Sequence, residues 1–431
     1  MAGRLGASSA LGLRPGEGRA VAWAAAMFFC VLASYYVLRP VREAVVLDGD
    51  PAFIPWLFTA TFLLTLAVAP PWGAAVARWS RARLVPRVYR AFILQLLAFA
   101  ALLSANVAPA ILTKVFYVWV SMFNLFVVSV FWSLCADLAR PGQGRRMFGL
   151  IAAGGTAGAL LGPALTRVLA AHVGTAALLG CSAVLLELAV RCSGRLDAAA
   201  RRLPALRDDD HAVAPPPADR PIGGAVLAGF NRLTRSWYLA AIAAYMICAA
   251  CLATFVYLRQ ADIVKLALPA RAERTAFFAE MELWTSLATL ALQLLVTGRA
   301  LRWLGAGVVL AALPVVQGVG VMVLVAAPTL VVTTAVTALG RATTHALSRP
   351  ARELLFTAVP REDKFKAKNV IDTFIYRLGD VGSAWLVHGL ALAGVAAGFV
   401  VVPLAAAWAA LALTLGRAFG RRTTSSSRST P

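Results

Sequence analysis

The sequence predicts an all-α polytopic membrane protein with about twelve transmembrane helices in two six-helix halves. The 431 residues are 60% hydrophobic and only 14% charged, whereas soluble domains are about 45–50% apolar and about 25% charged. Apolar runs long enough to span a bilayer recur along the chain. One long polar interruption, at 193–235, divides these runs into two sets of six.

The first half contains six apolar runs, each near the roughly 20 residues that a spanning helix requires. The first run is preceded by Arg4, Arg14 and Arg19, but it is too long for the apolar core of a signal peptide. We therefore interpret it as a spanning helix. The runs are rich in Ala and Leu rather than alternating, which excludes β-barrel spans. They centre on 20–38, 54–77, 88–107, 115–136, 147–171 and 174–192.

The second half follows a segment that carries Arg201-Arg202, an Asp triplet at 208–210 and a Pro triplet at 215–217. This composition is typical of a linker. The sequence therefore predicts bundles at 1–192 and 236–420, a cytoplasmic linker at 193–235 and a disordered tail at 421–431. The second set of spans centres on 237–258, 281–298, 307–326, 329–348, 371–394 and 396–416.

The charge distribution predicts the orientation of the chain. The net charge is +21, and most Lys and Arg residues fall in alternate loops, as the positive-inside rule expects of cytoplasmic loops. The opposite loops carry few charges, apart from 259–282. We expect a multi-pass protein of a bacterial inner membrane with both termini cytoplasmic, and basic loops against lipid headgroups. No nucleic-acid motif accompanies the basic residues, so a nucleic-acid partner is not expected.

Motifs for enzymatic chemistry are missing from the sequence. There is no Gly-Lys dipeptide and hence no P-loop, and no G-x-S-x-G motif. The four His residues show no metal-ligand spacing, and Cys248 and Cys251 are interpreted as small apolar helix residues. We therefore expect no enzyme activity, cofactor or metal.

Ionisable residues inside spans usually mark functional sites. Tyr35, Arg39 and Arg42 share one face of the first span at i, i+4 and i+7. All three are candidate substrate ligands, although the two arginines could instead reach the headgroups. Asn124 and Trp132 in the fourth span are further candidates, with helix bonding and interface anchoring as the alternatives.

The tenth and eleventh spans carry the clearest cationic stripe. Arg341 and His345 are one turn apart in the tenth span, in line with Thr337. Arg341 has no carboxylate on its own helix, so a partner helix or an anionic substrate must compensate it. Arg377 and Asp380 in the eleventh span could contact substrate or neutralise each other. Arginine suits phosphate and carboxylate groups because it binds them in a bidentate manner.

Two further groups are assigned to packing and gating. Gly154, Gly158 and Gly162, followed by Pro163, form a small-residue face on the fifth span that permits close helix approach. Asp137 could pair with Arg145 or Arg146 at the cytoplasmic end of the fourth span and open as the halves move. The predicted gating residues are Arg78, Arg81, Arg83, Asp137, Arg145, Arg146 and Glu353.

Several segments resemble known transporter families. The six-plus-six plan, the basic loop 73–83 and Gly162-Pro163 resemble the major facilitator superfamily. More specific strings resemble the bacterial ATP:ADP antiporter-like, or nucleotide exchange transporter, branch related to it. These strings are Tyr35–Arg42, Phe131–Asp137 followed by Arg145–Gly149, Arg349–Thr357, Lys364–Asp372 and Tyr376–Asp380.

This resemblance implies a monomeric secondary transporter that works by alternating access. It implies an anionic solute, namely a nucleotide or another phosphorylated or carboxylated metabolite. Other members of the branch carry Lys in the first and tenth spans and Glu in the fourth and eighth. This chain has Arg39 and Arg341 at the cationic positions, Asn124 in the fourth span, and Glu282 only near the outer end of the eighth.

Two other functions fit the same sequence. A proton-coupled exporter of amphiphiles or drugs would use Asp372, Asp380 or His345 as its titrating group. A membrane anchor or sensor that does not transport would dock a soluble partner through the basic segment 349–368.

Overall fold

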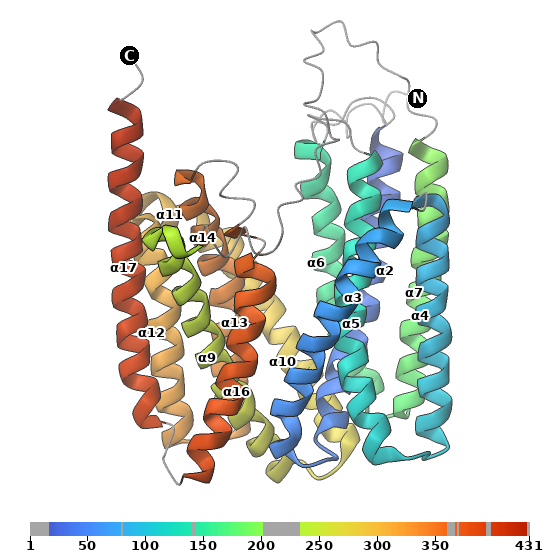
Figure 1. The fold of residues 1–431 in the computed structure, drawn as a ribbon. Coiled ribbons are helices and arrows are strands. Elements are labelled where there is room, and N and C mark those ends of the chain that lie inside the picture. The colour runs from blue at the N-terminus through green and yellow to red at the C-terminus, as the bar shows by residue number, and fades with distance from the viewer. Residues whose placement is uncertain are drawn as a thin grey trace, which may run out of the picture. The chain divides into compact units, whose positions relative to one another are not determined.

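A computed structural model of the chain describes residues 17–78, 81–138, 144–200, 233–359, 367–368, 370–393 and 398–428. All the regular elements in these ranges are helices (Figure 1). The chain forms two compact units. Unit 1 comprises Met1–Asp50, Leu63–Ala212 and Leu268–Leu283, and unit 2 comprises Pro51–Phe62, Val213–Ala267 and Trp284–Pro431.

Unit 1 is built around the first spanning helix. This helix, α2, packs against α6 and α7 and also contacts α5. Its apolar residues are buried along its whole length, and Pro40 lies inside it without ending it. The helices that begin in the first half of the chain are α2 (Glu17–Val46), α3 (Ile54–Arg78), α4 (Arg81–Ser104), α5 (Pro109–Leu138), α6 (Gly144–Leu169) and α7 (Thr175–Ala200).

The glycines of α6 explain its close contact with α2. A Cβ atom added at Gly154 or Gly158 would overlap the carbonyl oxygen of Ala25 or Phe29 on α2. A Cβ at Gly162 would lie 2.9 Å from the carbonyl oxygen of Ala33. The small-residue face predicted from sequence therefore lies in a helix–helix contact, where only glycine permits this approach.

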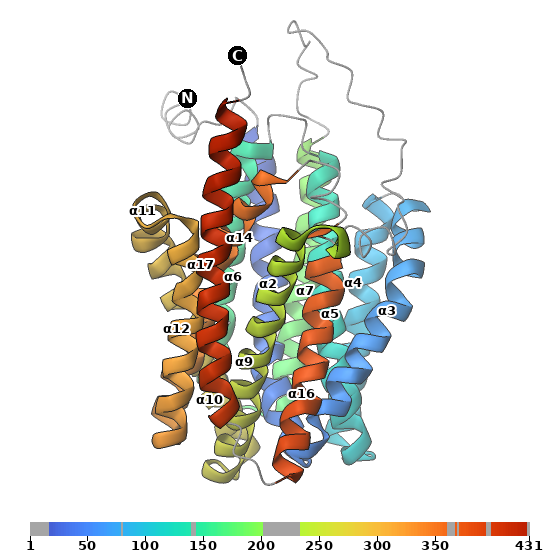
Figure 2. The ribbon, with the colours of Figure 1, turned by 60° about the vertical axis from the view of Figure 1, so that its left-hand side comes forward.

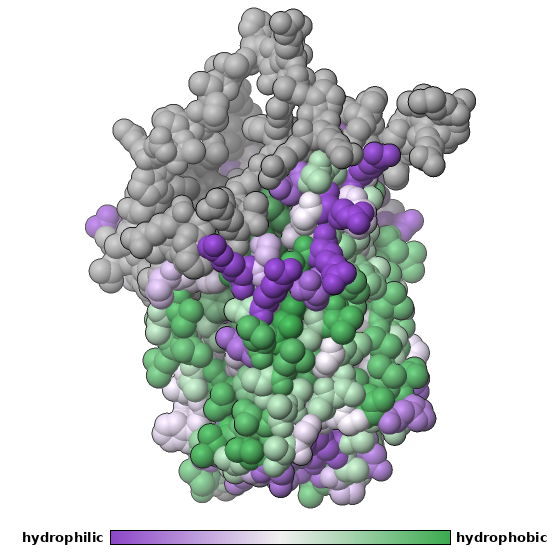
Figure 3. All heavy atoms as spheres, turned by 90° about the vertical axis from the view of Figure 1, so that its right-hand side faces the viewer, coloured by the Kyte–Doolittle hydropathy of each residue, from purple (hydrophilic) through white to green (hydrophobic). Residues whose placement is uncertain are grey.

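The outer faces of α4 and α7 are apolar and exposed. Leu94 and Leu97 on α4 and Val184 and Leu188 on α7 are all more than a third exposed. Figure 3 shows that apolar side chains form a broad band on the face it draws, with hydrophilic side chains gathered above and below. An exposed apolar band of this kind is the surface that a bilayer covers.

Unit 2 contains the remaining helices except for the first half of α10, and α12 and α17 lie side by side in it (Figure 2). Gly307 and Gly416 face each other in this pair, since a Cβ on Gly307 would lie 2.8 Å from the Cα of Gly416. The helices are α9 (Trp237–Ala267), α10 (Arg271–Leu292), α11 (Gly298–Trp303), α12 (Gly305–Ala326), α13 (Leu330–Thr343), α14 (Arg349–Leu355), α16 (Tyr376–Leu392) and α17 (Gly398–Arg428).

Three π-helical turns interrupt the helices of the second half. They are η3 (Gln293–Thr297) after α10, η4 (Thr344–Ser348) after α13, and η6 (Ile371–Ile375) before α16. Within the described residues, nine helices are long and apolar enough to span a membrane. The three other predicted spans correspond to the helices that these π turns divide. The predicted all-α polytopic fold is therefore confirmed.

Several element ends differ from the sequence prediction. The charged segment 259–282 was expected to be a loop, but α9 continues to Ala267 and α10 begins at Arg271. Its charges are compatible with a helix because several of them form ion pairs. Helix α7 continues to Ala200, past the expected bundle end at 192, and α17 continues to Arg428, so part of the expected tail is helical.

Two helices, α3 and α10, are divided between the two units. Residues 51–62, which include the start of α3, belong to unit 2. There the indole nitrogen of Trp385 donates to the hydroxyl oxygen of Thr59 at 3.1 Å, and Phe62 packs edge-on against Phe374. Residues 268–283, which include the first half of α10, belong to unit 1.

Candidate substrate-binding site

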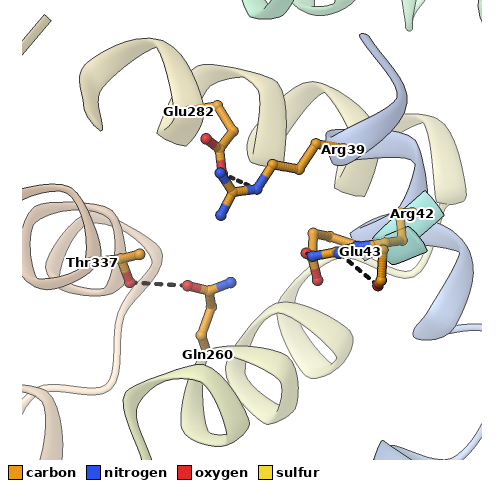
Figure 4. A network of polar contacts seen from close by, with 7 residues as sticks. Arg39, Arg42, Glu43, Gln260, Glu282 and Thr337 are labelled. Carbon is orange, nitrogen blue, oxygen red and sulfur yellow. Dashed lines mark hydrogen bonds and ion pairs between the residues drawn. The ribbon is translucent and has the colours of Figure 1, made fainter. Parts of the chain in front are cut away.

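The polar centre of unit 1 lies on the last turns of α2. Arg39 forms an ion pair with Glu282 of α10, with 3.2 Å between Arg39 Nε and Glu282 Oε1 (Figure 4). The Glu282 side chain is only 2% exposed. A buried carboxylate of this kind requires a cationic partner, since leaving it unpaired carries a large desolvation cost. Arg39 was predicted as a substrate ligand, and the structure places it in this ion pair.

Arg42 is held by three neighbours. Its Nη2 pairs with the carboxylate of Glu43, its Nη1 donates to Ser121 Oγ at 3.1 Å, and its guanidinium carbon lies 4.8 Å from the ring centroid of Tyr117. Stacking on an aromatic face and pairing with a carboxylate both stabilise a partly buried guanidinium. Each arginine of this face therefore has a carboxylate partner, and the face is neutral overall.

The other predicted ligands of unit 1 lie apart from one another. Tyr35 is buried and packs edge-on against Tyr36. Trp132 lies in an aromatic group, with its ring centroid 5.3 Å from Phe28 and 5.6 Å from Phe148. Asn124 is half-buried on α5. These contacts assign Tyr35 and Trp132 to the packed interior of the unit.

The polar centre of unit 2 is formed by two helices with their π turns. Tyr376 begins α16, and the charges of Asp380, Arg377, Arg341 and Arg349 all act on its hydroxyl group. The structure thus brings together the stripe on α13 and the stripe on α16 that the sequence predicts. Thr337, one turn before Arg341, donates from Oγ1 to Gln260 Oε1 of α9 at 2.9 Å (Figure 4).

His345 lies in a different backbone setting from Arg341. It lies in the π turn η4 and its side chain is exposed, whereas Arg341 is half-buried. A π turn inserts an extra residue into the helical repeat, so residues beyond it rotate away from the face they would share in a regular α-helix.

Arg352 was missed as a site residue. Its Nη2 lies 3.0 Å from Asp372 Oδ1, its Nη1 contacts the Met246 sulfur, and its side chain is 8% exposed. Lys368 Nζ lies 2.6 Å from Glu353 Oε2 beside it. The sequence signal was the Arg-Glu pair in a basic stretch, which was interpreted as a cytoplasmic loop or docking surface. Because Arg352 is buried and paired, it is not available to dock a soluble partner.

Net charge distinguishes the two centres. The described residues of 330–393 carry five cations and three carboxylates, an excess of two positive charges. The cations are Arg341, Arg349, Arg352, Lys368 and Arg377, and the carboxylates are Glu353, Asp372 and Asp380. An excess of cations in a partly buried setting favours an anionic ligand.

The predicted inner gate lies largely outside what the structure describes. The side chains of Arg78, Arg81, Arg83, Asp137, Arg145 and Arg146 are outside the described residues, whereas that of Glu353 is described. Within the described residues, no group of three or more His, Cys, Asp or Glu side chains could hold a metal ion.

The fold is similar to that of solved membrane transporters. The nucleoside transporter NupG matches with a TM-score of 0.59 and 13% sequence identity, over 95% of this chain and 99% of that chain. A bacterial homologue of the human lysosomal transporter Spinster, in an inward-facing and unoccupied conformation, matches with a TM-score of 0.56 and 14% identity, over 95% of each chain. At these identities the likeness shows the fold alone. No family model matches the chain, and no curated protein does.

Proposed function

We propose that the chain is a secondary-active transporter that works by alternating access and moves a small anionic solute. Its fold is that of solved transporters at nearly full length. The observation that carries the anionic assignment is the electrostatic surrounding of the Tyr376 hydroxyl group, on which three arginines, Arg341, Arg349 and Arg377, act together with one carboxylate, Asp380.

The proposed solute is a nucleotide or another phosphorylated or carboxylated metabolite. One similar structure is a nucleoside transporter, but a nucleoside is uncharged and would not compensate the cations of unit 2. Arginine forms paired hydrogen bonds with the oxygens of a phosphate or carboxylate. The strings that resemble the ATP:ADP antiporter branch support the phosphorylated class. The charge pattern of the loops supports a bacterial inner membrane with cytoplasmic termini.

A thermal-shift panel on the purified protein tests this proposal. Its ligands are nucleosides, nucleoside mono-, di- and triphosphates, sugar phosphates and dicarboxylates. A ligand of the native state raises the unfolding temperature as its concentration exceeds Kd. We expect anions, and not nucleosides, to stabilise the protein, and the best anion to exchange in proteoliposomes.

Arg341→Gln should weaken binding of that anion by about 10- to 100-fold, since a hydrogen bond to a charged group contributes about 1.5–3 kcal/mol. The matched control is Arg299→Gln in the same unit, because the exposed Arg299 donates only to the carbonyl oxygen of Leu295 within its own helix. The proposal is wrong if no anion stabilises the protein, or if both variants bind equally well.

Carboxylate removal gives an independent test of the charge argument. Asp380→Asn deletes one of the countercharges in unit 2 and should strengthen anion binding several-fold, as a nearby charge contributes about 1 kcal/mol in a solvated site. Glu43→Gln in unit 1 should leave anion binding unchanged. Equal effects of the two variants would contradict an anion site in unit 2.

A further inference from the structure

The contact between α4 and α7 carries an ionic cluster on the outer surface of unit 1. Glu187 of α7 lies between two arginines, with its Oε2 3.5 Å from Arg90 Nε of α4 and its Oε1 3.5 Å from Arg191 Nε one turn further along α7. The Arg90 and Arg191 side chains are 61% and 74% exposed, and Glu187 is 32% exposed. The cluster therefore faces outward from the packed interior of the unit.

The surface beside this cluster is apolar. Leu94 lies one turn after Arg90 on α4, and Leu188 and Val184 lie one and two turns before Arg191 on α7. All three apolar side chains are exposed. Figure 3 draws the side of the molecule on which α4 and α7 lie in Figure 1, and hydrophilic side chains border its apolar band. The cluster therefore adjoins a surface that lipid chains cover.

The lengths of the two helices give the depth of the cluster. Arg90 lies 104 − 90 = 14 residues before the end of α4 at Ser104, and Arg191 lies 191 − 175 = 16 residues after the start of α7 at Thr175. At 1.5 Å per residue, these separations are about 21 Å and about 24 Å. The hydrocarbon core of a bilayer is about 30 Å thick. Long arginine side chains at this depth reach the headgroups of the nearer leaflet.

The charge of this region is positive. Residues 84–90 of α4 and 187–197 of α7 carry four arginines and two carboxylates, an excess of 4 − 2 = 2 positive charges. Arg90 and Arg191 both contact Glu187 through Nε, and within the described residues no contact engages their terminal nitrogens. Those nitrogens form the planar fork that matches the oxygens of a phosphate group. The arginines are Arg87, Arg90, Arg191 and Arg195, and the carboxylates are Glu187 and Asp197.

We propose that this α4–α7 surface binds the headgroup of an anionic phospholipid. The lipid phosphate lies between Arg90 and Arg191, and the acyl chains lie along Leu94 and Val184. Glu187 positions the two arginines by pairing with both, and does not itself contact the lipid. A zwitterionic headgroup would leave the positive excess uncompensated. A second copy of the chain, packed by the same face, would bring two positive clusters together, which like-charge repulsion disfavours.

Native mass spectrometry of the delipidated full chain tests the lipid site without any transport substrate. The probes are dioleoyl phosphatidylglycerol and dioleoyl phosphatidylethanolamine, which have the same acyl chains and differ in headgroup charge. We expect the first phosphatidylglycerol to bind about tenfold more tightly than phosphatidylethanolamine. The double variant Arg90→Gln, Arg191→Gln should weaken phosphatidylglycerol binding about 10- to 30-fold, because each arginine near an anionic headgroup contributes about fivefold. Its binding of phosphatidylethanolamine should stay unchanged.

The matched control removes two exposed, paired arginines elsewhere. Arg167 pairs with Glu280 and Arg259 pairs with Asp262, so Arg167→Gln, Arg259→Gln deletes the same charge away from α4 and α7. It should bind phosphatidylglycerol as the unmodified chain does. Both double variants should keep the native unfolding temperature, because exposed ion pairs contribute little stability. Glu187→Gln should strengthen phosphatidylglycerol binding about twofold or more, since it raises the local positive charge.

Four other results would overturn the proposal. Equal losses in the two double variants would mean that lipid responds only to net charge. Displacement of the lipid by inorganic phosphate at the same concentration would indicate a site for free anions. Weaker binding in Glu187→Gln would mean that the carboxylate itself holds a zwitterionic headgroup. A dimer that Arg90→Gln, Arg191→Gln dissociates would identify a second copy as the occupant. Transport does not enter this test, so failure of the lipid site and failure of the proposed transport activity are distinguishable.

Discussion

Unit 1 and unit 2 differ in how their helices are built and in how their charges are balanced. The α2–α6 contact of unit 1 closes through three glycines, and each arginine of α2's polar face has a carboxylate partner. Unit 2 contains the three π turns of the described residues, and its polar centre has more cations than carboxylates. Irregular helix and unbalanced charge both carry a stability cost, and natural proteins retain them mainly at functional sites. Under the proposed function, unit 1 is the rigid frame and unit 2 supplies the charge that binds the anion.

The largest effect should come from breaking the frame of unit 1. Gly158→Leu places a side chain where even a Cβ would overlap the carbonyl oxygen of Phe29. Overpacking of a tight contact costs at least about 3 kcal/mol when the backbone has to move. We expect strongly reduced yield and a large fall in unfolding temperature. Gly149→Leu on the same helix is the control, because a Cβ there meets nothing within 4 Å. Similar losses in both variants would contradict a tight α2–α6 contact.

A smaller loss should follow from breaking the buried ion pair of unit 2. Arg352→Met leaves Asp372 without its cation, which should cost about 2 kcal/mol, less than a fully buried pair because Asp372 keeps a third of its exposure. Lys368→Met removes an exposed pair with Glu353 and should cost about 0.5 kcal/mol or less. Chemical or thermal unfolding of the purified variants measures both.

The double variant Arg352→Met, Asp372→Leu sharpens this test. Replacement of both charges by apolar groups should recover most of the loss, because a buried pair gains little over apolar packing. If the double variant is less stable than Arg352→Met alone, Arg352 stabilises the unit by another route.

The sequence predicts the helices well and their interruptions poorly. Long apolar runs locate the spans, and the spacing of Gly154, Gly158 and Gly162 predicts a contact that the structure contains. The π turns are missed because a single residue inserted into a helix leaves the apolar run as long and as apolar as before. The inserted residue changes only the direction in which the side chains of the helix point. His345 lies in one of these turns, η4.

Long-range pairing is the other feature that the sequence does not reveal. The start of α10 resembles a loop because of its charges, and those charges are compatible with a buried helix only once Arg274 meets Asp48, 226 residues earlier. Local spacing predicts the gathering of Tyr376, Arg377 and Asp380 because they lie within one helix. Local spacing gives no partner for Arg352, because Asp372, the carboxylate that pairs with it, lies in a later helical element of the chain.

The smallest expected effect tests whether the π turns of unit 2 act together. The Thr297 hydroxyl in η3 donates to the carbonyl oxygen of Ala346 in η4 at 2.8 Å and also reaches that of Leu292 in α10 at 3.0 Å, so a hydroxyl of one π turn bonds the backbone of the next. Thr297→Val keeps the shape of the side chain and removes the donor, which should cost about 1 kcal/mol. Because the lost bond joins two turns, hydrogen exchange should rise at both 293–297 and 344–348.

Thr414→Val on α17 is the control, since the Thr414 hydroxyl donates only to the carbonyl oxygen of Leu411 in its own helix. It should change neither stability nor exchange in the π turns. A rise confined to 293–297 in Thr297→Val would mean that the turns are independent irregularities. A rise in both would mean that the irregular backbone of unit 2 is one connected structure beside its excess charge.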